Sequence, residues 1–138
     1  MKINIYICIS HWDHTGANLE LKKGSKDVII YGPEGERNKI PGIDHAVGGG
    51  DSFTFGGGDD VQVLDVGGHT RGHIAYYIPS QNVVFVGDAL FALGCGKMFE
   101  GTPSQFWSSL QTLRSLPDET TVYWYVLFSH SNSLFILK

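Results

Sequence analysis

The chain has 138 residues, of which 42% are hydrophobic and 17% charged, and its formal net charge is −4. These values predict one soluble globular domain rather than a disordered chain. The acidic balance and the lack of a lysine or arginine run argue against nucleic acid as a partner. No apolar run approaches the roughly 20 residues of a membrane span, so we expect no membrane partner either.

The cysteines and the first residues bear on where the protein works. Cys8 and Cys95 are too few for a disulfide framework, so we expect a reducing compartment. The first ten residues turn polar too soon for a secretory signal. The sequence therefore predicts a cytoplasmic protein and leaves its oligomeric state open.

Strands dominate the predicted elements in chain order. β-branched and aromatic residues predict strands at 3–8 and 27–31, with a helix from about Gly16 to Lys22 between them. Two pairs of strands read as hairpins, 52–55 with 61–66 and 74–78 with 82–86, and a last strand spans 121–128. This order favours a sheet-rich α/β domain.

One further helix has the clearest boundaries in the chain. Thr102 is the predicted N-cap, Pro103 takes the first helical position, and Gln105 completes a capping box. Pro117 ends the run. The apolar residues at helical spacing on one face are Phe106, Leu110 and Leu113.

Imidazole and carboxylate side chains gather where predicted strands give way to loops. They are His11, Asp13, His14, His69 and Asp88. A sheet scaffold assembles a metal site from such residues at strand ends, and the neighbouring glycines let the backbone turn sharply. Two histidines and an aspartate within four residues are hard to attribute to turns, so the set predicts a metal centre.

Each of these residues also has an ordinary explanation when taken alone. A single loop histidine such as His69 is usually solvated or satisfied in the core. Asp88 alone could form a turn and Asp13 could cap the following helix. His45 has no comparable neighbours, so we do not count it as a ligand.

Several segments resemble the metallo-β-lactamase superfamily, and within it the glyoxalase II (hydroxyacylglutathione hydrolase) family. The superfamily resemblance lies in His11-Trp12-Asp13-His14, in the G-H-T-x-G-H of 68–73 and in Gly87-Asp88. The narrower resemblance lies in IPGIDHAVGGGDSF (40–53), in GCGKMFEGT (94–102) and in SLPDETTVY (115–123).

The resemblance implies an αββα sandwich with a binuclear centre, usually of zinc and sometimes of iron or manganese. In that family a metal-bridging hydroxide attacks the thioester of S-D-lactoylglutathione and releases D-lactate and glutathione. Asp13 and Asp88 would be catalytic. By resemblance, His11 and His69 would serve the first metal, Asp13 and His14 the second, and Asp88 would bridge them.

The resemblance also assigns roles near the glutathione. Lys97 would meet its glycine carboxylate, and Phe99 stands where the family often has a tyrosine. We expect Cys95 to be a packed small residue, because a metal hydroxide leaves a thiol nucleophile no task.

The chain departs from the family pattern at two ligand positions. Ile9 stands where the family has the first histidine of H-x-H-x-D-H, and Val126 stands where it has a later one. His130 lies four residues beyond and would replace it only if the last strand slipped. We therefore expect residues 1–123 to form a partial domain, without the family's N-terminal strands and C-terminal helical domain, and 124–138 a divergent tail.

Three functions follow from this sequence. The first is a thioester hydrolase of the glyoxalase II type, which the segment 94–102 favours. The second is a mononuclear iron persulfide dioxygenase, because His11, His69 and Asp88 form a two-histidine, one-carboxylate set. The third is an inactive metal-binding remnant.

Overall fold

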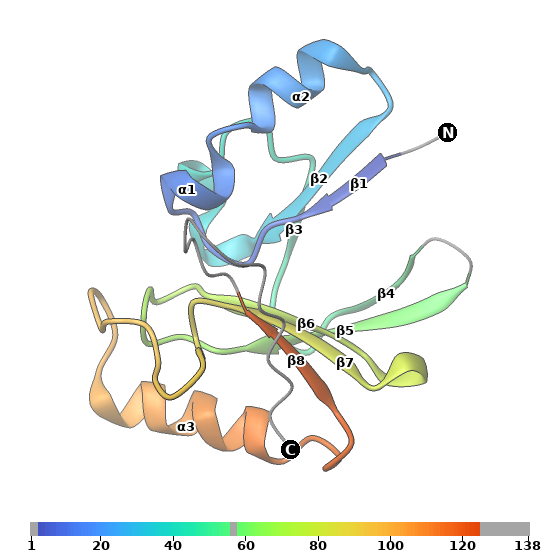
Figure 1. The fold of residues 1–138 in the computed structure, drawn as a ribbon. Coiled ribbons are helices and arrows are strands. Elements are labelled where there is room, and N and C mark those ends of the chain that lie inside the picture. The colour runs from blue at the N-terminus through green and yellow to red at the C-terminus, as the bar shows by residue number, and fades with distance from the viewer. Residues whose placement is uncertain (1–2, 56–57, 125–138) are drawn as a thin grey trace.

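The computed structural model describes residues 3–55 and 58–124 as two stacked sheets with helices on their outer faces (Figure 1). The strands are β1 (Ile3–Tyr6), β2 (Val28–Pro33), β3 (His45–Val47), β4 (Ser52–Phe55), β5 (Asp59–Asp65), β6 (Ile74–Ile78), β7 (Val83–Gly87) and β8 (Thr121–Trp124). The α-helices are α1 (Trp12–Thr15), α2 (Asn18–Gly24) and α3 (Pro103–Arg114), and the 3-10 helices are η1 (Glu34–Lys39) and η2 (Pro79–Gln81).

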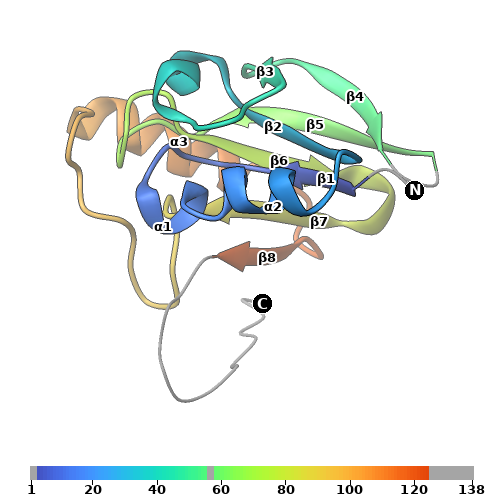
Figure 2. The ribbon, with the colours of Figure 1, turned by 90° about the horizontal axis from the view of Figure 1, so that it is seen from above.

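The first sheet has three parallel strands in the order β1-β2-β3. Its β-branched residues alternate between the two faces, and Val28 and Ile30 of β2 are buried in a cluster that also contains Ile7 and Ile40. Helix α2 covers the outer face of this sheet, as the view from above shows (Figure 2). The loop that leaves β1 carries the first histidine cluster.

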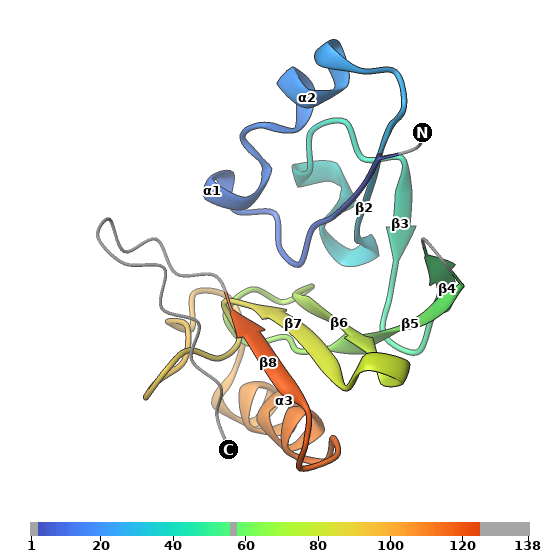
Figure 3. The same cartoon turned by 45° about the vertical axis from the view of Figure 1, so that its right-hand side comes forward.

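The second sheet has five strands in the order β4-β5-β6-β7-β8. Neighbours from β4 to β7 are antiparallel, whereas β8 runs parallel to β7. All five residues of the central strand β6 are buried, because one face meets the first sheet and the other meets α3. Figure 3 shows the two sheets face to face, with α3 beneath the second.

The predicted signals at the start of α3 are present in the structure. The Thr102 side chain accepts a hydrogen bond from the Gln105 backbone N–H at 3.2 Å, and Pro103 opens the helix. The Gln105 amide does not return this bond and donates to the Arg71 carbonyl at 3.3 Å instead. Phe106 is buried as expected, but Leu110 is only partly covered.

The interior between the sheets is apolar and aromatic. Ile9, Val63 and Ile74 are buried there at 2% exposure or less. Tyr6 stacks on Tyr31 with ring centroids 5.0 Å apart. Burial of such side chains is the main favourable contribution to folding, so this cluster holds the two sheets together.

Several predicted boundaries are wrong in detail. The first strand ends at Tyr6 rather than at residue 8. The helix predicted from about Gly16 to Lys22 is α2, shifted by two residues, and the short helix α1 before it was not predicted. The strand β3 was not predicted, because three residues give too little alternation to recognise. The last strand is described only to Trp124, so Val126 and His130 lie outside the described residues.

The two cysteines differ in burial. Both cysteines are free thiols; Cys8 is buried, while Cys95 is exposed, which corrects the expectation that Cys95 is packed. Burial raises the pKa of the Cys8 thiol to about 12, so Cys8 stays protonated. Within 3–55 and 58–124, no helix is long and apolar enough to cross a bilayer.

Candidate metal centre

The first sheet delivers His11 and His14 through one short turn. His11 is the N-cap of α1 with an extended backbone (φ −62°, ψ 147°), and its carbonyl accepts from the backbone N–H of His14 and of Thr15. In this four-residue helix, His14 faces Asp88 of the second sheet, whereas Asp13 is exposed. This turn therefore points two imidazoles at the gap between the sheets.

The second sheet delivers His69 and Asp88 from turns that follow β5 and β7. Before His69 the backbone of Gly68 has a φ of +149°, and a Cβ there would lie 2.4 Å from the Phe106 ring. Before Asp88 the backbone of Gly87 has a φ of +53°. Only glycine adopts such conformations without strain, and both turns direct the following side chain inward.

His11, His69 and Asp88 converge although they come from different sheets. Their ligand atoms all lie within 4.8 Å of one another. His69 Nε2 is 3.1 Å from His11 Nδ1 and 3.3 Å from Asp88 Oδ2. His69 and Asp88 are buried, at 5% and 8% exposure, and His11 is partly exposed. Two of the three residues are thus buried, and His11 reaches the surface.

The donor atoms of this cluster suit a divalent cation. His69 Nδ1 lies 2.7 Å from the Lys97 carbonyl oxygen, and because a carbonyl only accepts, that nitrogen carries the hydrogen. When the ring is neutral, the Nε2 lone pair therefore faces His11 and Asp88, and when the ring is protonated, the Nε2–H donates to Asp88. An imidazole oriented by a backbone carbonyl on its far nitrogen is the usual arrangement of a metal-binding histidine. Two imidazoles and a carboxylate at this spacing fit a cation of the zinc or iron type.

The charges of the cluster reinforce one another. Burial alone would raise the pKa of Asp88, but hydrogen bonds from His14 and His69 and their charge hold it well below its usual range. Burial alone would lower the pKa of His69, but its contacts with Asp88 and the Lys97 carbonyl raise it. Asp88 is thus a carboxylate at neutral pH and the anionic centre of the site.

The other predicted ligands lie around this cluster at longer distances. His14 Nε2 is 3.4 Å from Asp88 Oδ2 and 3.8 Å from Asp13 Oδ2. The side chain of Asp13 is 51% exposed. Asp88 therefore lies between His69 on one side and His14 on the other. A cavity of about 650 Å³ between the sheets reaches Asp13 and His14.

Ile9 takes no part in the cluster and belongs to the interior. Its side chain is fully buried among apolar residues that include Val61 and Ile74. Described residues thus supply no imidazole at the position that the family pattern gives to its first histidine.

The segment 94–102 borders the cluster on the open side. Phe99 is 60% exposed, and its ring lies 5.2 Å from the His69 ring and 5.8 Å from the His11 ring, measured between centroids. Lys97 Nζ lies 5.2 Å from the centre of the Phe99 ring. At Gly96 a Cβ would come within 2.2 Å of the Asp88 carbonyl oxygen, so only glycine lets this segment lie so close.

Two residues near the site escaped the sequence reasoning. Glu36, in η1, is 3% exposed and its carboxylate contacts the loops of both sheets, which no local pattern signals. His73 is 1% exposed, and burial followed by the charge of His69 lowers its pKa to about 3. His73 belongs to the G-H-T-x-G-H motif, which could have drawn attention to it.

The fold and the clustered histidines and aspartate define a known class. The family model of the metallo-beta-lactamase superfamily matches residues 10–125. The chain belongs to this superfamily. The αββα architecture predicted from the sequence is confirmed.

Within the superfamily the chain is most informatively compared with hydroxyacylglutathione hydrolases. It is 49% identical to the hydroxyacylglutathione hydrolase of Hyphomonas neptunium over 128 residues. This alignment covers 91% of this chain and 49% of the relative. It is 47% identical over 124 residues to that of Rhizobium meliloti, covering 90% and 46%. The chain spans about half the length of these curated relatives.

Solved structures share the fold of this chain. ETHE1 from Myxococcus xanthus matches with a TM-score of 0.77 and 31% identity, over 93% of this chain and 55% of that one. TTHA1623, solved in a di-iron-bound form, matches with a TM-score of 0.75 and 29% identity, over 90% and 69%.

Proposed function

We propose that this chain carries the metal centre of a hydroxyacylglutathione hydrolase. His11, His69 and Asp88 would hold one divalent ion, and Asp13, His14 and Asp88 a second. Zinc suits the nitrogen and carboxylate donors, and iron or manganese are alternatives. The observation that carries the proposal is the convergence of His11, His69 and Asp88 from separate sheets onto one point.

A cation bound here would supply Lewis acidity, both activating a water molecule and polarising a thioester carbonyl. The protein residues have separate tasks. Asp88 keeps its negative charge and holds the imidazoles of His14 and His69 toward the site. Phe99 forms an apolar wall beside those rings, and Lys97 offers an exposed cation to a substrate carboxylate.

The substrate class comes from the relatives. Their name states hydrolysis of hydroxyacylglutathione, and they share 47–49% of residues with this chain. We therefore propose S-D-lactoylglutathione as substrate, hydrolysed to D-lactate and glutathione in the removal of methylglyoxal. The two free thiols, Cys8 and Cys95, suit the reducing cytoplasm, where we place this activity.

Thioester hydrolysis by the purified, zinc-loaded chain tests the proposal. Loss of thioester absorbance from S-lactoylglutathione should require zinc and should disappear in Asp88→Asn. His45→Asn is the matched control, because His45 is an exposed histidine of β3 stacked on Tyr31. Zinc-independent turnover, or equal rates in both variants, would exclude the proposed site.

The composition of the three-residue cluster favours a second candidate. Two histidines and one carboxylate are also the ligand set of mononuclear iron oxygenases. A protein of this kind would take up one iron and consume oxygen in the presence of glutathione persulfide. Metal analysis after loading with iron, together with an oxygen electrode, separates it from the hydrolase.

A further inference from the structure

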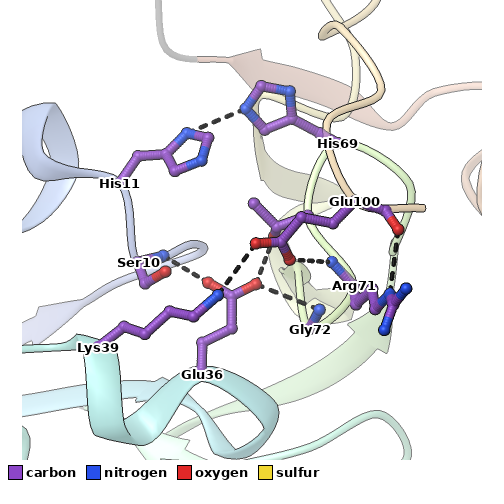
Figure 4. Close-up of polar contacts among 9 residues, drawn as sticks. Ser10, His11, Glu36, Lys39, His69, Arg71, Gly72 and Glu100 are labelled. Atoms are coloured by element: carbon purple, nitrogen blue, oxygen red, sulfur yellow. Dashed lines mark hydrogen bonds and ion pairs between the residues drawn. The ribbon is translucent and has the colours of Figure 1, made fainter.

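Glu36 is a buried carboxylate that contacts the loops on both sides of the metal centre. It lies in η1, between β2 and β3, and is 3% exposed. Its Oε2 accepts from the Ser10 backbone N–H at 2.7 Å. Its Oε1 accepts from the Thr70 hydroxyl and from the Gly72 backbone N–H at 3.2 Å. Figure 4 shows this carboxylate between the two loops.

Two of the three partners of Glu36 lie next to a candidate metal ligand. Ser10 directly precedes His11 on the loop from the first sheet. Thr70 directly follows His69 on the loop from the second sheet. Oε2 of Glu36 therefore holds the loop of His11, and Oε1 holds the loop of His69.

We propose that Glu36 is a positioning residue that sets the distance between His11 and His69, and through it the affinity of the metal centre. The two imidazoles belong to different sheets, so their spacing depends on contacts that cross from one loop to the other. Hydrogen bonds to a carboxylate are stronger than those between neutral groups, and a buried acceptor that lost its donors would be costly. The three bonds therefore favour one separation of the loops.

A second link runs parallel to this one at the surface. Lys39, also in η1, contacts Glu100 at 3.0 Å, and Glu100 accepts from the Arg71 backbone N–H at 3.2 Å. Lys39 is 57% exposed, so this link is weak in water. Of these two links, the one through the buried carboxylate of Glu36 is therefore the stronger.

The variant Glu36→Gln distinguishes the hydrogen bonds of this side chain from its size. It keeps the size of the side chain but has a single acceptor oxygen, so the backbone N–H of either Ser10 or Gly72 must lose its acceptor. Asp44→Asn is a matched control in the same layer. The Asp44 carboxylate accepts from the Ile30 backbone N–H at 2.8 Å and from Lys22, neither of which lies on a ligand loop.

The first measurement needs no metal and therefore does not depend on the proposed hydrolase. In the metal-free wild-type protein, the rings of His11 and His69, with centroids 4.8 Å apart, should give a nuclear Overhauser contact. We expect Glu36→Gln to lose it and Asp44→Asn to keep it. If Glu36→Gln keeps the ring contact, the carboxylate does not position the imidazoles and the proposal is wrong.

The second measurement rests on the proposed metal centre. Zinc affinity, titrated against a competing chelator under conditions where each variant is folded, should fall by roughly 10–100-fold in Glu36→Gln. Asp44→Asn should bind zinc as the wild type does. Lower thermal stability with unchanged zinc affinity would reduce Glu36 to a structural role. If the wild type binds no zinc, the metal proposal fails while the ring contact still decides the role of Glu36.

Thr70→Val keeps the test decisive if Glu36→Gln fails to fold. This change removes one hydroxyl donor to Glu36 and leaves the carboxylate in place. We expect a smaller loss of zinc affinity and a weakened ring contact. Where both single variants fold, the double variant should bind zinc no more weakly than Glu36→Gln alone, because both changes break one link. Additive losses would show that Thr70 acts independently of Glu36.

Discussion

The two sheets contribute to the proposed metal centre in different ways. His69 and Asp88, from the second sheet, are buried and fixed by glycine turns and by the Lys97 carbonyl. His11, from the first sheet, is partly exposed and starts a helix of four residues. The second sheet therefore forms its half of the site by itself, whereas the first sheet needs cross-links such as Glu36 to bring its half into place.

The two sheets also differ in size. The second sheet has five strands, and α3 covers its outer face, whereas the first has three parallel strands. β1 lies at the edge of that sheet, with β2 as its one paired neighbour among the described strands. Because the loop to His11 leaves this edge strand, we expect it to open at lower free energy than the turns of the second sheet.

The largest effect should come from the ligand that contacts both halves. Asp88 lies between His14 at 3.4 Å and His69 at 3.3 Å, so Asp88→Asn removes the anionic centre of the whole cluster. We expect zinc affinity to fall by at least about 100-fold, more than for a residue that only orients a ligand. Isothermal titration with zinc measures it. His11→Asn should cost less, and a larger loss there would reverse the ranking of the two sheets.

The sequence predicted the elements with strong local signals. Strand β6 has the predicted bounds 74–78, and the helix at Pro103 starts where the capping residues placed it. The site residues His11, His69 and Asp88 were visible because each follows a strand beside a glycine or a second polar residue. Glu36 was not, because its contacts to Ser10 and Thr70 span 26 and 34 residues. Such pairings exist only after the two sheets have packed.

A second prediction concerns the position where the first sheet lacks an imidazole. Ile9 is fully buried, so Ile9→His places a polar ring in an apolar cluster and should cost about 1–3 kcal/mol of unfolding free energy. Position 9 is where the family pattern has its first histidine, two residues before His11 on the loop that leaves β1, so we expect the new ring to join His11 at the metal centre. Urea unfolding should therefore show that zinc stabilises the variant more than the wild type.

Ile9→Val is the control for this prediction. It removes one methylene from the same cluster and should cost about 0.5–1.5 kcal/mol without any added response to zinc. Equal zinc responses in Ile9→His and Ile9→Val would show that position 9 faces only the interior.

The third prediction uses the buried His73 of the second sheet. Its folded pKa of about 3 lies below the ordinary value of 6.5, so the unfolded chain binds one more proton between these values. The free energy of unfolding that neutral His73 contributes is fully present above pH 6.5. It is lost as the pH falls below that value, by at most about 1.4 kcal/mol per pH unit for one proton. The raised pKa of His69 acts above 6.5, outside this range.

Unfolding free energies measured between pH 4 and 6.5 check this expectation, and His73→Gln removes the titrating group. The variant is destabilised at neutral pH by the loss of the ring's packing, but its slope with pH should be shallower than that of the wild type. Identical slopes would place the acid sensitivity elsewhere, for example in Asp88, whose lowered pKa contributes mainly below pH 4.

The smallest effect should come from the exposed link between the two sheets. Lys39→Met breaks the ion pair of Lys39 with Glu100 but keeps the length of the side chain. Exposed pairs contribute about 0.2–1 kcal/mol, and salt screens them, so thermal unfolding should differ from wild type only at low ionic strength. Zinc affinity should stay within about twofold, well short of the loss expected where a residue orients a ligand. A loss as large as that of Glu36→Gln would mean that the surface link, and not the buried carboxylate, holds the first sheet's half of the site in place.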